Sequence, residues 1–199
     1  MIAIIDYGAG NLFSVKNALN YLGISNEVTS SKRQIERADA LILPGVGAFP
    51  DAMNMLVQNN VDLLLREQVG QKPIFGICLG MQLLFDEGIE FQRTRGLGFI
   101  PGSVVKIEAE DLKIPHMGWN RLRFENTSPI LKEIKADSYV YFVHSYRAET
   151  EDKHICAYSE YGEKIPALVQ NGFVYGAQFH PEKSGEVGLQ MLKNFADLV

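Results

Sequence analysis

Three short apolar runs, each ended by residues that break a strand, most constrain the fold of this chain. They are IAIID (2–6), ALILPG (40–45) and PIFGIC (73–78). None shows the polar alternation of a strand with one face in water. Continuous apolar runs of this length are typical of strands buried on both faces of a parallel sheet. The sequence therefore predicts a sheet with other elements covering both of its faces.

Helical patterns fill the intervals between these runs. The first interval carries apolar residues at helical spacing, namely Leu12, Val15, Leu19 and Leu22. Asn11 is placed to cap this helix, and Ser31 with Gln34 has the spacing of a capping box for a second helix. A third pattern, over residues 51–69, is interrupted near Asn59. This order predicts an α/β fold with an open, doubly wound, mostly parallel sheet flanked by helices, similar to flavodoxin.

The pattern changes after about residue 97. Short β-rich segments follow one another, separated by glycine, proline and asparagine, which predicts an antiparallel β extension. An amphipathic helix around Val187, Met191 and Phe195 is expected to close the chain. The 199 residues contain no internal repeat and no Pro/Ser-rich linker, so one domain spanning 1–199 is expected.

Charge and cysteine content exclude several classes of protein. The net charge is −5 and the basic residues stand in small groups beside acids, which argues against a nucleic-acid-binding surface. No run approaches the roughly 18 apolar residues of a membrane span, and the first residues lack the features of a signal peptide. Two cysteines form neither a disulfide framework nor a zinc pattern, so a reducing, cytoplasmic setting and no metal are expected.

The glycine-rich turn DYGAGN (6–11) lies between a predicted strand and a predicted helix, where a dinucleotide can bind. Counted from Gly8 and Gly10, however, the third glycine of that fingerprint is replaced by Phe13. A tight strand-to-helix turn is therefore the preferred interpretation, and no cofactor is expected.

A second strand-to-helix junction places Cys78 between Gly76 and Gly80, in the sequence GICLG. This G-x-nucleophile-x-G pattern is that of a nucleophile elbow, in which a strained turn presents a reactive side chain above the sheet edge. Free cysteines are also among the most often buried residues and are then inert. The glycines alone leave both interpretations open, and a nearby base is needed to decide between them.

Of the four histidines, His180 is the best candidate for that base. It ends a predicted strand and is followed by Pro181 and Glu182, and Glu182 is close enough to orient the imidazole. The alternative is a solvated turn. His154 lies in a β-like run and is interpreted as structural, while His116 and His144 precede small or aromatic residues without a nearby acid. An oxyanion site would use the Leu79 N–H and a second N–H from the glycine-containing loop LPGVGAF (43–49).

Together, PGVGAF, GICLGMQ and HPEKS closely resemble the motifs of the class I, triad-type glutamine amidotransferases. IIDYGAGNLFSV (4–15) and HMGWN (116–120) are similar to the glutaminase subunits of imidazole glycerol phosphate synthase. The resemblance implies that Cys78 is the nucleophile, His180 the general base and acid, and Glu182 the residue that orients it. It also implies oxyanion donors at Leu79 and at Val46 or Gly47, and contacts to the substrate glutamine from Gln82, Ser145 and Tyr146.

The resemblance further implies a reaction and a partner. Cys78 would form a γ-glutamyl thioester with L-glutamine, and the ammonia would pass through a channel to a (β/α)8-barrel cyclase in a heterodimer. That cyclase makes imidazole glycerol phosphate and AICAR in histidine biosynthesis. Trp119, the sole tryptophan, is either an interface anchor or a core residue, and Lys183 either pairs with an acid on the partner or is a solvated lysine.

Two alternatives remain at the level of sequence. A similar glutaminase subunit would supply ammonia to another synthase, such as one that amidinates a sugar. A protein of another class, a flavodoxin-like binding module, would carry Cys78 as a packed, unreactive thiol.

Overall fold

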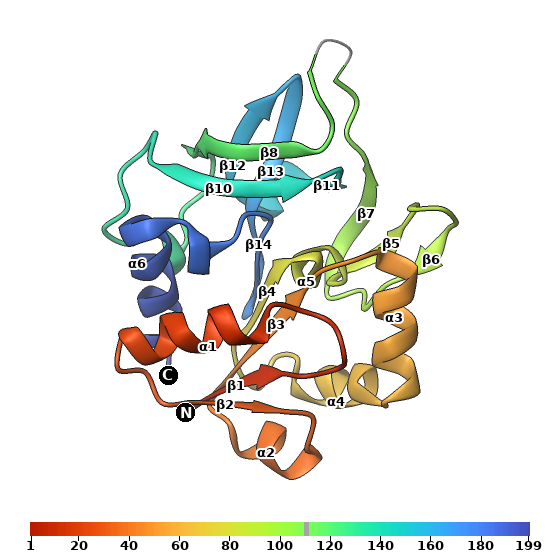
Figure 1. Ribbon diagram of the computed structural model, residues 1–199, viewed down its shortest axis with the longest axis vertical. Helices are drawn as coiled ribbons and strands as arrows, with labels where there is room; N and C mark the ends of the chain where they lie inside the picture. The colour runs from red at the N-terminus through yellow and green to blue at the C-terminus, as the bar shows by residue number, and fades with distance from the viewer. Residues whose placement is uncertain (110–111) are drawn as a thin grey trace.

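The computed structural model describes residues 1–109 and 112–199 (Figure 1). Within these residues the largest sheet has eight strands, in the order β2 (Asn26–Thr29), β1 (Ile2–Ile5), β3 (Ala40–Gly45), β4 (Ile74–Cys78), β14 (Val174–Ala177), β13 (Glu163–Asn171), β12 (Ile155–Tyr161) and β9 (Arg123–Phe124). The strands from β2 to β14 are parallel, and β13, β12 and β9 continue the sheet in antiparallel pairs. The predicted mixed sheet with an antiparallel extension is confirmed.

Shorter strands form two further sheets. One is an antiparallel ribbon of β8 (His116–Arg121) and β10 (Tyr139–His144), which lie side by side at the top of Figure 1. The other has the order β11 (Tyr146–Glu149), β7 (Ile100–Lys106), β5 (Phe85–Gly88) and β6 (Thr94–Arg95). Short 3-10 helices are η1 (Pro129–Leu131), η2 (Asp152–His154) and η3 (Pro181–Lys183).

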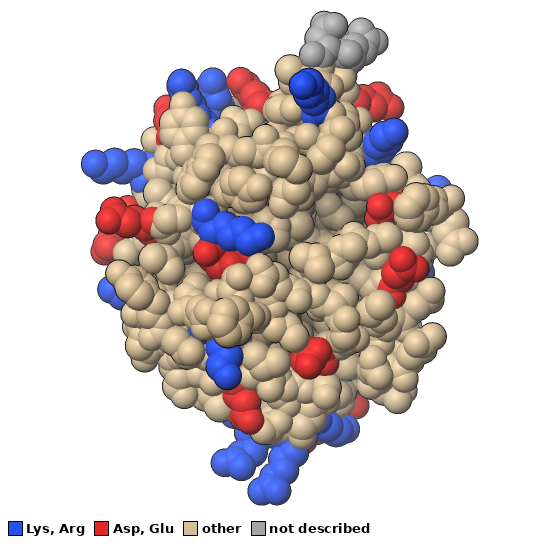
Figure 2. Space-filling view, viewed as in Figure 1, with Lys and Arg blue, Asp and Glu red and all other residues tan. Residues whose placement is uncertain are grey.

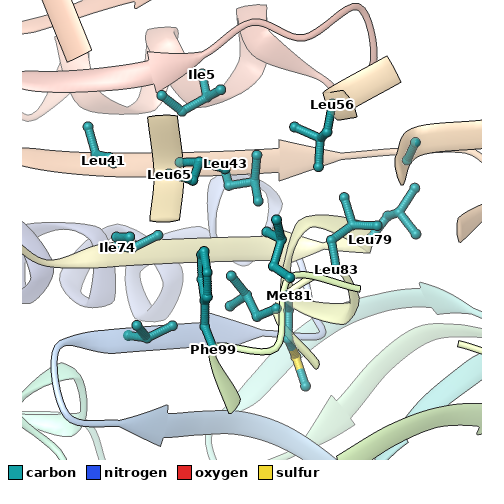
Figure 3. Packing of buried hydrophobic residues seen from close by; sticks show 14 of the residues in the cluster. Ile5, Leu41, Leu43, Leu56, Leu65, Ile74, Leu79, Met81, Leu83 and Phe99 are labelled. Atoms are coloured by element: carbon teal, nitrogen blue, oxygen red, sulfur yellow. The ribbon is translucent and has the colours of Figure 1, made fainter. Parts of the chain in front are cut away.

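Helices cover both faces of the parallel strands, as the apolar runs predict. On one face lie α1 (Leu12–Tyr21) and α6 (Gly185–Ala196); on the other lie α2 (Lys32–Arg37), α3 (Phe49–Gln58) and α4 (Val61–Gln68). Successive strand residues point to opposite faces, so β1, β3, β4 and β14 each contribute to both apolar clusters. Figure 3 shows the cluster beneath α3 and α4, in which strand residues meet Leu56, Leu65 and Phe99.

The local details of the helices confirm some predictions and correct one. The Asn11 side chain accepts a hydrogen bond from Ser14 N at 3.4 Å, as a helix cap does, and α3 and α4 are separated at residues 59–60. The predicted capping box is wrong. Ser31 makes no side-chain cap. The reciprocal bond is also missing, because the Ser31 N–H donates to Thr29 Oγ1 and the Gln34 side chain is bonded to Thr29 and Glu27.

The surface mixes charges of both signs. On the face drawn in Figure 2, acidic and basic side chains lie mainly around the rim. No helix in the described part of the chain is long and apolar enough to cross a membrane.

Candidate active site

The carboxyl edge of the parallel sheet brings distant segments together. Gly45 at the end of β3 pairs in register with Cys78 at the end of β4, and Ala177 of β14 pairs with Ile77. His180 follows only three residues after Ala177. Because the ends of neighbouring parallel strands meet at one edge, the segments around residues 46, 78 and 180 converge there.

Cys78 sits in a backbone conformation that side chains rarely adopt. Its φ is 56° and its ψ is −114°, directly between β4 and the single-turn helix α5 (Leu79–Gln82). The turn packs so closely that a Cβ at Gly80 would lie 1.8 Å from Leu43 O, and one at Gly76 would lie 2.6 Å from Gly80 O. Both glycines are therefore required by close packing, and the tight turn leaves the thiol 8% exposed.

His180 is held by Glu182 and by the ribbon. Its Nδ1 lies 2.8 Å from Glu182 Oε1, and its backbone N–H donates to Tyr141 O in β10 at 3.0 Å. The Glu182 side chain is only 1% exposed, so its carboxylate is screened little by water. Burial lowers the pKa of His180, but hydrogen bonds and charge from Cys78 and Glu182 outweigh burial and raise that pKa to about 9.

Cys78 and His180 both line a cavity of about 280 Å³. Its lining comprises Val46, Gly47, Cys78, Leu79, Gln82, Glu90, Val143, His144, Tyr146 and His180. A larger hollow of about 500 Å³ lies between α1 and α6, and its lining includes Glu182 but neither Cys78 nor His180. The smaller cavity is the candidate active site because it alone of these two exposes the thiol and the imidazole together.

The loop that follows β3 forms one wall of this cavity. Gly47 has a φ of +102°, a backbone conformation that favours glycine. Crowding plays no part, because a Cβ at this position would meet nothing within 4 Å. Val46 is 46% exposed. Directly after the loop, the first backbone N–H of α3, from Phe49, donates to Glu90 Oε2 at 2.8 Å.

The predicted substrate contacts are only partly in the cavity. Gln82 and Tyr146 line it, whereas Ser145 lies next to Tyr146 and is not part of the lining. Both donors of the Gln82 amide are engaged, by Tyr146 O and by Gln178 Oε1, each at 3.0 Å. Gln82 therefore offers a ligand only its Oε1 acceptor.

Three of the lining residues were not predicted as site residues from the sequence: Glu90, Val143 and His144. Glu90 stands among other acids, Asp86 and Glu87, and nothing in its local pattern separates it from them. His144 has no acid nearby in sequence, so its local pattern does not favour it as a site residue. Both reach the cavity through sheet pairings that the sequence does not specify.

Trp119 and Lys183 lie outside the cavity. Trp119 is 56% exposed on β8, so the interpretation as a core residue is wrong. It pairs across the ribbon with Tyr141, and the two ring centroids are 6.1 Å apart. Lys183 is exposed in η3, beside the His180 and Glu182 pair.

The described residues contain no group of three His, Cys, Asp or Glu side chains placed to hold a metal ion. A thiol, an imidazole that shares its cavity and a buried carboxylate bonded to that imidazole are the parts of a nucleophilic triad. Such an arrangement is suited to acyl transfer when N–H donors stabilise the oxyanion.

Comparison with known proteins adds to this geometry. The model of the family "Glutamine amidotransferase class-I" matches residues 3–198. The chain belongs to the class-I glutamine amidotransferases. Relatives include the imidazole glycerol phosphate synthase subunit HisH of Bacillus cereus (strain B4264), 52% identical over 100% of this chain and 95% of that protein. HisH of Shouchella clausii is also 52% identical, over 100% and 99% of the two chains.

Two solved structures share the fold. A crystal structure of a glutamine amidotransferase superposes with a TM-score of 0.77 at 21% identity, covering 100% of this chain and 98% of that one. The structure of PurLQS from Thermotoga maritima gives a TM-score of 0.78 at 20% identity, with 99% and 97% covered. Membership of this amidotransferase family contradicts the alternative of a non-catalytic flavodoxin-like module.

Proposed function

We propose that this amidotransferase hydrolyses L-glutamine to glutamate and ammonia and delivers the ammonia to the cyclase subunit of imidazole glycerol phosphate synthase, in histidine biosynthesis. The cyclase would use the ammonia to make imidazole glycerol phosphate and AICAR. The observation that carries the proposal is the strained Cys78 turn in one cavity with His180, whose imidazole is bonded to the buried Glu182. The 52% identity to HisH subunits supports this choice of synthase over one that amidinates a sugar.

In the first step, the Cys78 thiolate attacks the side-chain carboxamide carbon of glutamine. Glu182 accepts the His180 Nδ1 hydrogen, which leaves Nε2 to take the thiol proton. The raised pKa of His180, about 9, favours this imidazolium and thiolate pair at neutral pH. The backbone N–H of Leu79 and one N–H from Val46 or Gly47 stabilise the oxyanion.

In the second step, the tetrahedral intermediate collapses. Its C–N bond breaks, the imidazolium of His180 gives its proton to the nitrogen, and ammonia leaves behind a γ-glutamyl thioester on Cys78. A water molecule then loses a proton to His180 and attacks the thioester carbon. The C–S bond breaks and glutamate is released.

The polar lining suits the charged α-carbon end of free glutamine, while its neutral carboxamide end reaches Cys78. The Glu90 carboxylate and Gln82 Oε1 are acceptors for the α-ammonium group, and the segment of Ser145 and Tyr146, of which Tyr146 lines the cavity, holds the α-carboxylate. Glu90 also accepts the hydrogen bond of Phe49, directly after the 46–47 loop. Substrate at Glu90 therefore contacts the same carboxylate that anchors the oxyanion loop.

The partner surface in this proposal is the outer face of the ribbon, which we call the β8–β10 surface. Its exposed apolar side chains are Met117, Trp119 and Tyr139, which are 61%, 56% and 47% exposed. Val143 of the same ribbon lines the cavity, so the surface continues into the place where ammonia forms. A (β/α)8-barrel cyclase seated there, in a heterodimer, receives the ammonia without its passing through water, and Lys183 is available to pair with an acid on that subunit.

The proposal treats residues 1–199 as one glutaminase domain in the cytoplasm. The family match over 3–198 and the sheet that joins both halves of the chain support the first statement. Both cysteines are free, which suits a reducing compartment.

Covalent labelling tests the proposed nucleophile. The complex with the cyclase subunit would be treated with 6-diazo-5-oxo-norleucine, an electrophilic glutamine analogue, and its mass measured. We expect one adduct, on Cys78, that Cys78→Ala abolishes and Cys156→Ala, the control at the other buried cysteine, retains. Glutamate release should be low for the isolated chain and should rise strongly with the partner. Labelling of Cys78→Ala, or full activity of the isolated chain, would contradict the proposal.

A further inference from the structure

A chain of hydrogen bonds runs through the protein interior from strand β8 to the glutamine cavity. Asn120 Nδ2 lies 3.2 Å from His116 Nε2, and His116 Nδ1 lies 3.0 Å from His144 Nε2. His144 Nδ1 then lies 2.8 Å from Tyr146 O, which also accepts from Gln82 Nε2 at 3.0 Å. These hydrogen bonds therefore connect Asn120, the residue after Trp119, to the backbone that lines the cavity.

The direction of every bond in this chain is determined by its ends. The Tyr146 carbonyl can only accept, so His144 Nδ1 carries the hydrogen and His144 Nε2 accepts. His116 must then donate from Nδ1 and accept at Nε2. The bonds of Asn120 lead to the same assignment. Its Oδ1 accepts from Arg121 N at 2.8 Å, which fixes the orientation of the amide. Its Nδ2 therefore donates, to Glu160 O at 3.0 Å and to His116 Nε2. Both imidazoles are thus neutral and of one tautomer.

The surroundings of the two rings favour their neutral forms. His116 and His144 are 2% and 6% exposed, and burial lowers their pKa values to about 4 and about 3. The titratable groups that face them are Tyr161, stacked on His116, and His180, whose charge lowers the pKa of His144 further. A second proton on either ring would set two donors against each other and break the chain.

We propose that Asn120, His116 and His144 are positioning residues, which hold the Tyr146 carbonyl and with it the glutamine-binding wall in a fixed place relative to strand β8. This inference rests on the proposed function. The carbonyl is held from two sides, by His144 and by Gln82, so the wall cannot shift without breaking one of these bonds. Since Asn120 follows Trp119 on β8, a partner seated on the β8–β10 surface contacts the strand from which this chain starts.

The first test reads the tautomers directly. ¹⁵N–¹H NMR through two-bond couplings assigns the protonated nitrogen of each imidazole in the complete chain at pH 7. We expect both His116 and His144 to carry one hydrogen, on Nδ1, and His154, the other buried histidine outside the site, serves as an internal reference. A hydrogen on Nε2 of His116 or His144, or a charged ring, overturns the proposal. This measurement requires no activity.

The second test breaks the chain with a change of almost no volume. Asn120→Asp replaces the donor at His116 Nε2 by an acceptor. In the complex with the cyclase subunit at saturating concentration, we expect KM for glutamine to rise about tenfold and kcat to stay within about twofold, because ground-state positioning is lost. The matched control is Asn126→Asp, since Asn126 Nδ2 likewise makes two hydrogen bonds, here to the backbone carbonyls of Asp152 and Ile155 at 2.7 Å each, outside the cavity lining.

An equal KM in the two aspartate variants overturns the proposal, as does a loss confined to kcat. If Asn120→Asp fails to fold, His116→Gln is measured in the same way against His154→Gln. Absence of glutamate release by the wild-type complex would count against the proposed function, whereas the NMR result for the histidines stands apart from it.

Discussion

Two buried histidines line the same cavity, and their pKa values are shifted in opposite directions from that of an ordinary imidazole. His180, at the sheet edge, has its pKa raised to about 9, because Cys78 and Glu182 outweigh the effect of burial. His144, in the ribbon, has its pKa lowered to about 3, because burial dominates and its ring neighbour is the neutral His116. The comparison teaches that the partners of a buried imidazole, more than its burial, decide whether it can carry a proton.

The two regions also differ in how completely their polar atoms are paired. All ring nitrogens of His116 and His144 have hydrogen-bond partners. At the sheet edge, by contrast, Tyr7 Oη, Gln178 Nε2 and Glu182 Oε2 are buried with no partner within residues 1–109 and 112–199. The two histidines of the ribbon are thus fixed by their hydrogen-bond partners, while these three buried polar atoms at the sheet edge have none among the described residues.

The largest expected effect separates the two histidines by kinetics. His180→Gln removes the proposed proton carrier, so we expect kcat in the complex to fall by about 10³-fold or more. His144→Gln removes only a positioning bond and should act mainly on KM for glutamine. Glutamate release at varied glutamine concentration measures both. Equal losses of kcat in the two variants would contradict the division of roles.

The next effect concerns the ribbon as a docking surface. Trp119→Ala should weaken binding to the cyclase subunit by about 30-fold or more, as the loss of an interface anchor does. Its control is Phe173→Ala, because Phe173 is similarly exposed, 55% against 56%, but lies at the opposite end of β14 from His180. Isothermal titration calorimetry gives both affinities. The same affinity in both variants would exclude the β8–β10 surface as the interface.

The opposite pKa shifts also predict how stability depends on pH. The raised pKa of His180 adds to the free energy of unfolding. This contribution is complete below pH 6.5 and is lost as the pH rises toward about 9. The lowered values of His144 and His116 give contributions that are complete above pH 6.5 and are lost as the pH falls toward about 3 and 4. The free energy of unfolding should therefore be largest near pH 6.5.

Urea unfolding of three proteins at a series of pH values measures this dependence. Relative to the wild type, His144→Gln should flatten the acid side of the curve and His180→Gln the alkaline side. If His144→Gln changes the alkaline side instead, the assignment of neutral and charged histidines is wrong.

The smallest expected effect tests the unpaired hydroxyl at the sheet edge. Burial, with the charge of Cys78, raises the pKa of Tyr7, so this side chain keeps its proton. Because its hydroxyl has no partner among the described residues, Tyr7→Phe should leave the free energy of unfolding unchanged or raise it by about 1 kcal/mol. Urea unfolding at pH 7 checks this value. A loss of stability would show that the hydroxyl is bonded.

The elements at the sheet edge could be predicted from sequence because their signals are local. Apolar runs mark β1, β3 and β4, and the glycines around Cys78 mark a turn whose geometry admits little else. Glu90 and His144 could not be recognised as lining residues in this way. Their positions depend on pairings in β5 and β10 with distant strands, and short strands do not encode those pairings in their own pattern. The exposure of Trp119 depends on the same pairings.

The conformation of Cys78 has a consequence for evolution of the chain. A φ of 56° costs a residue with a side chain about 1–3 kcal/mol, and glycine would occupy this position with little strain. Replacement by glycine is thus expected to raise the free energy of unfolding and, if Cys78 is the nucleophile as proposed, to abolish glutamine hydrolysis. Under that proposal, selection for activity and selection for stability act in opposite directions at this one residue, so the active protein stays below the stability that its fold allows.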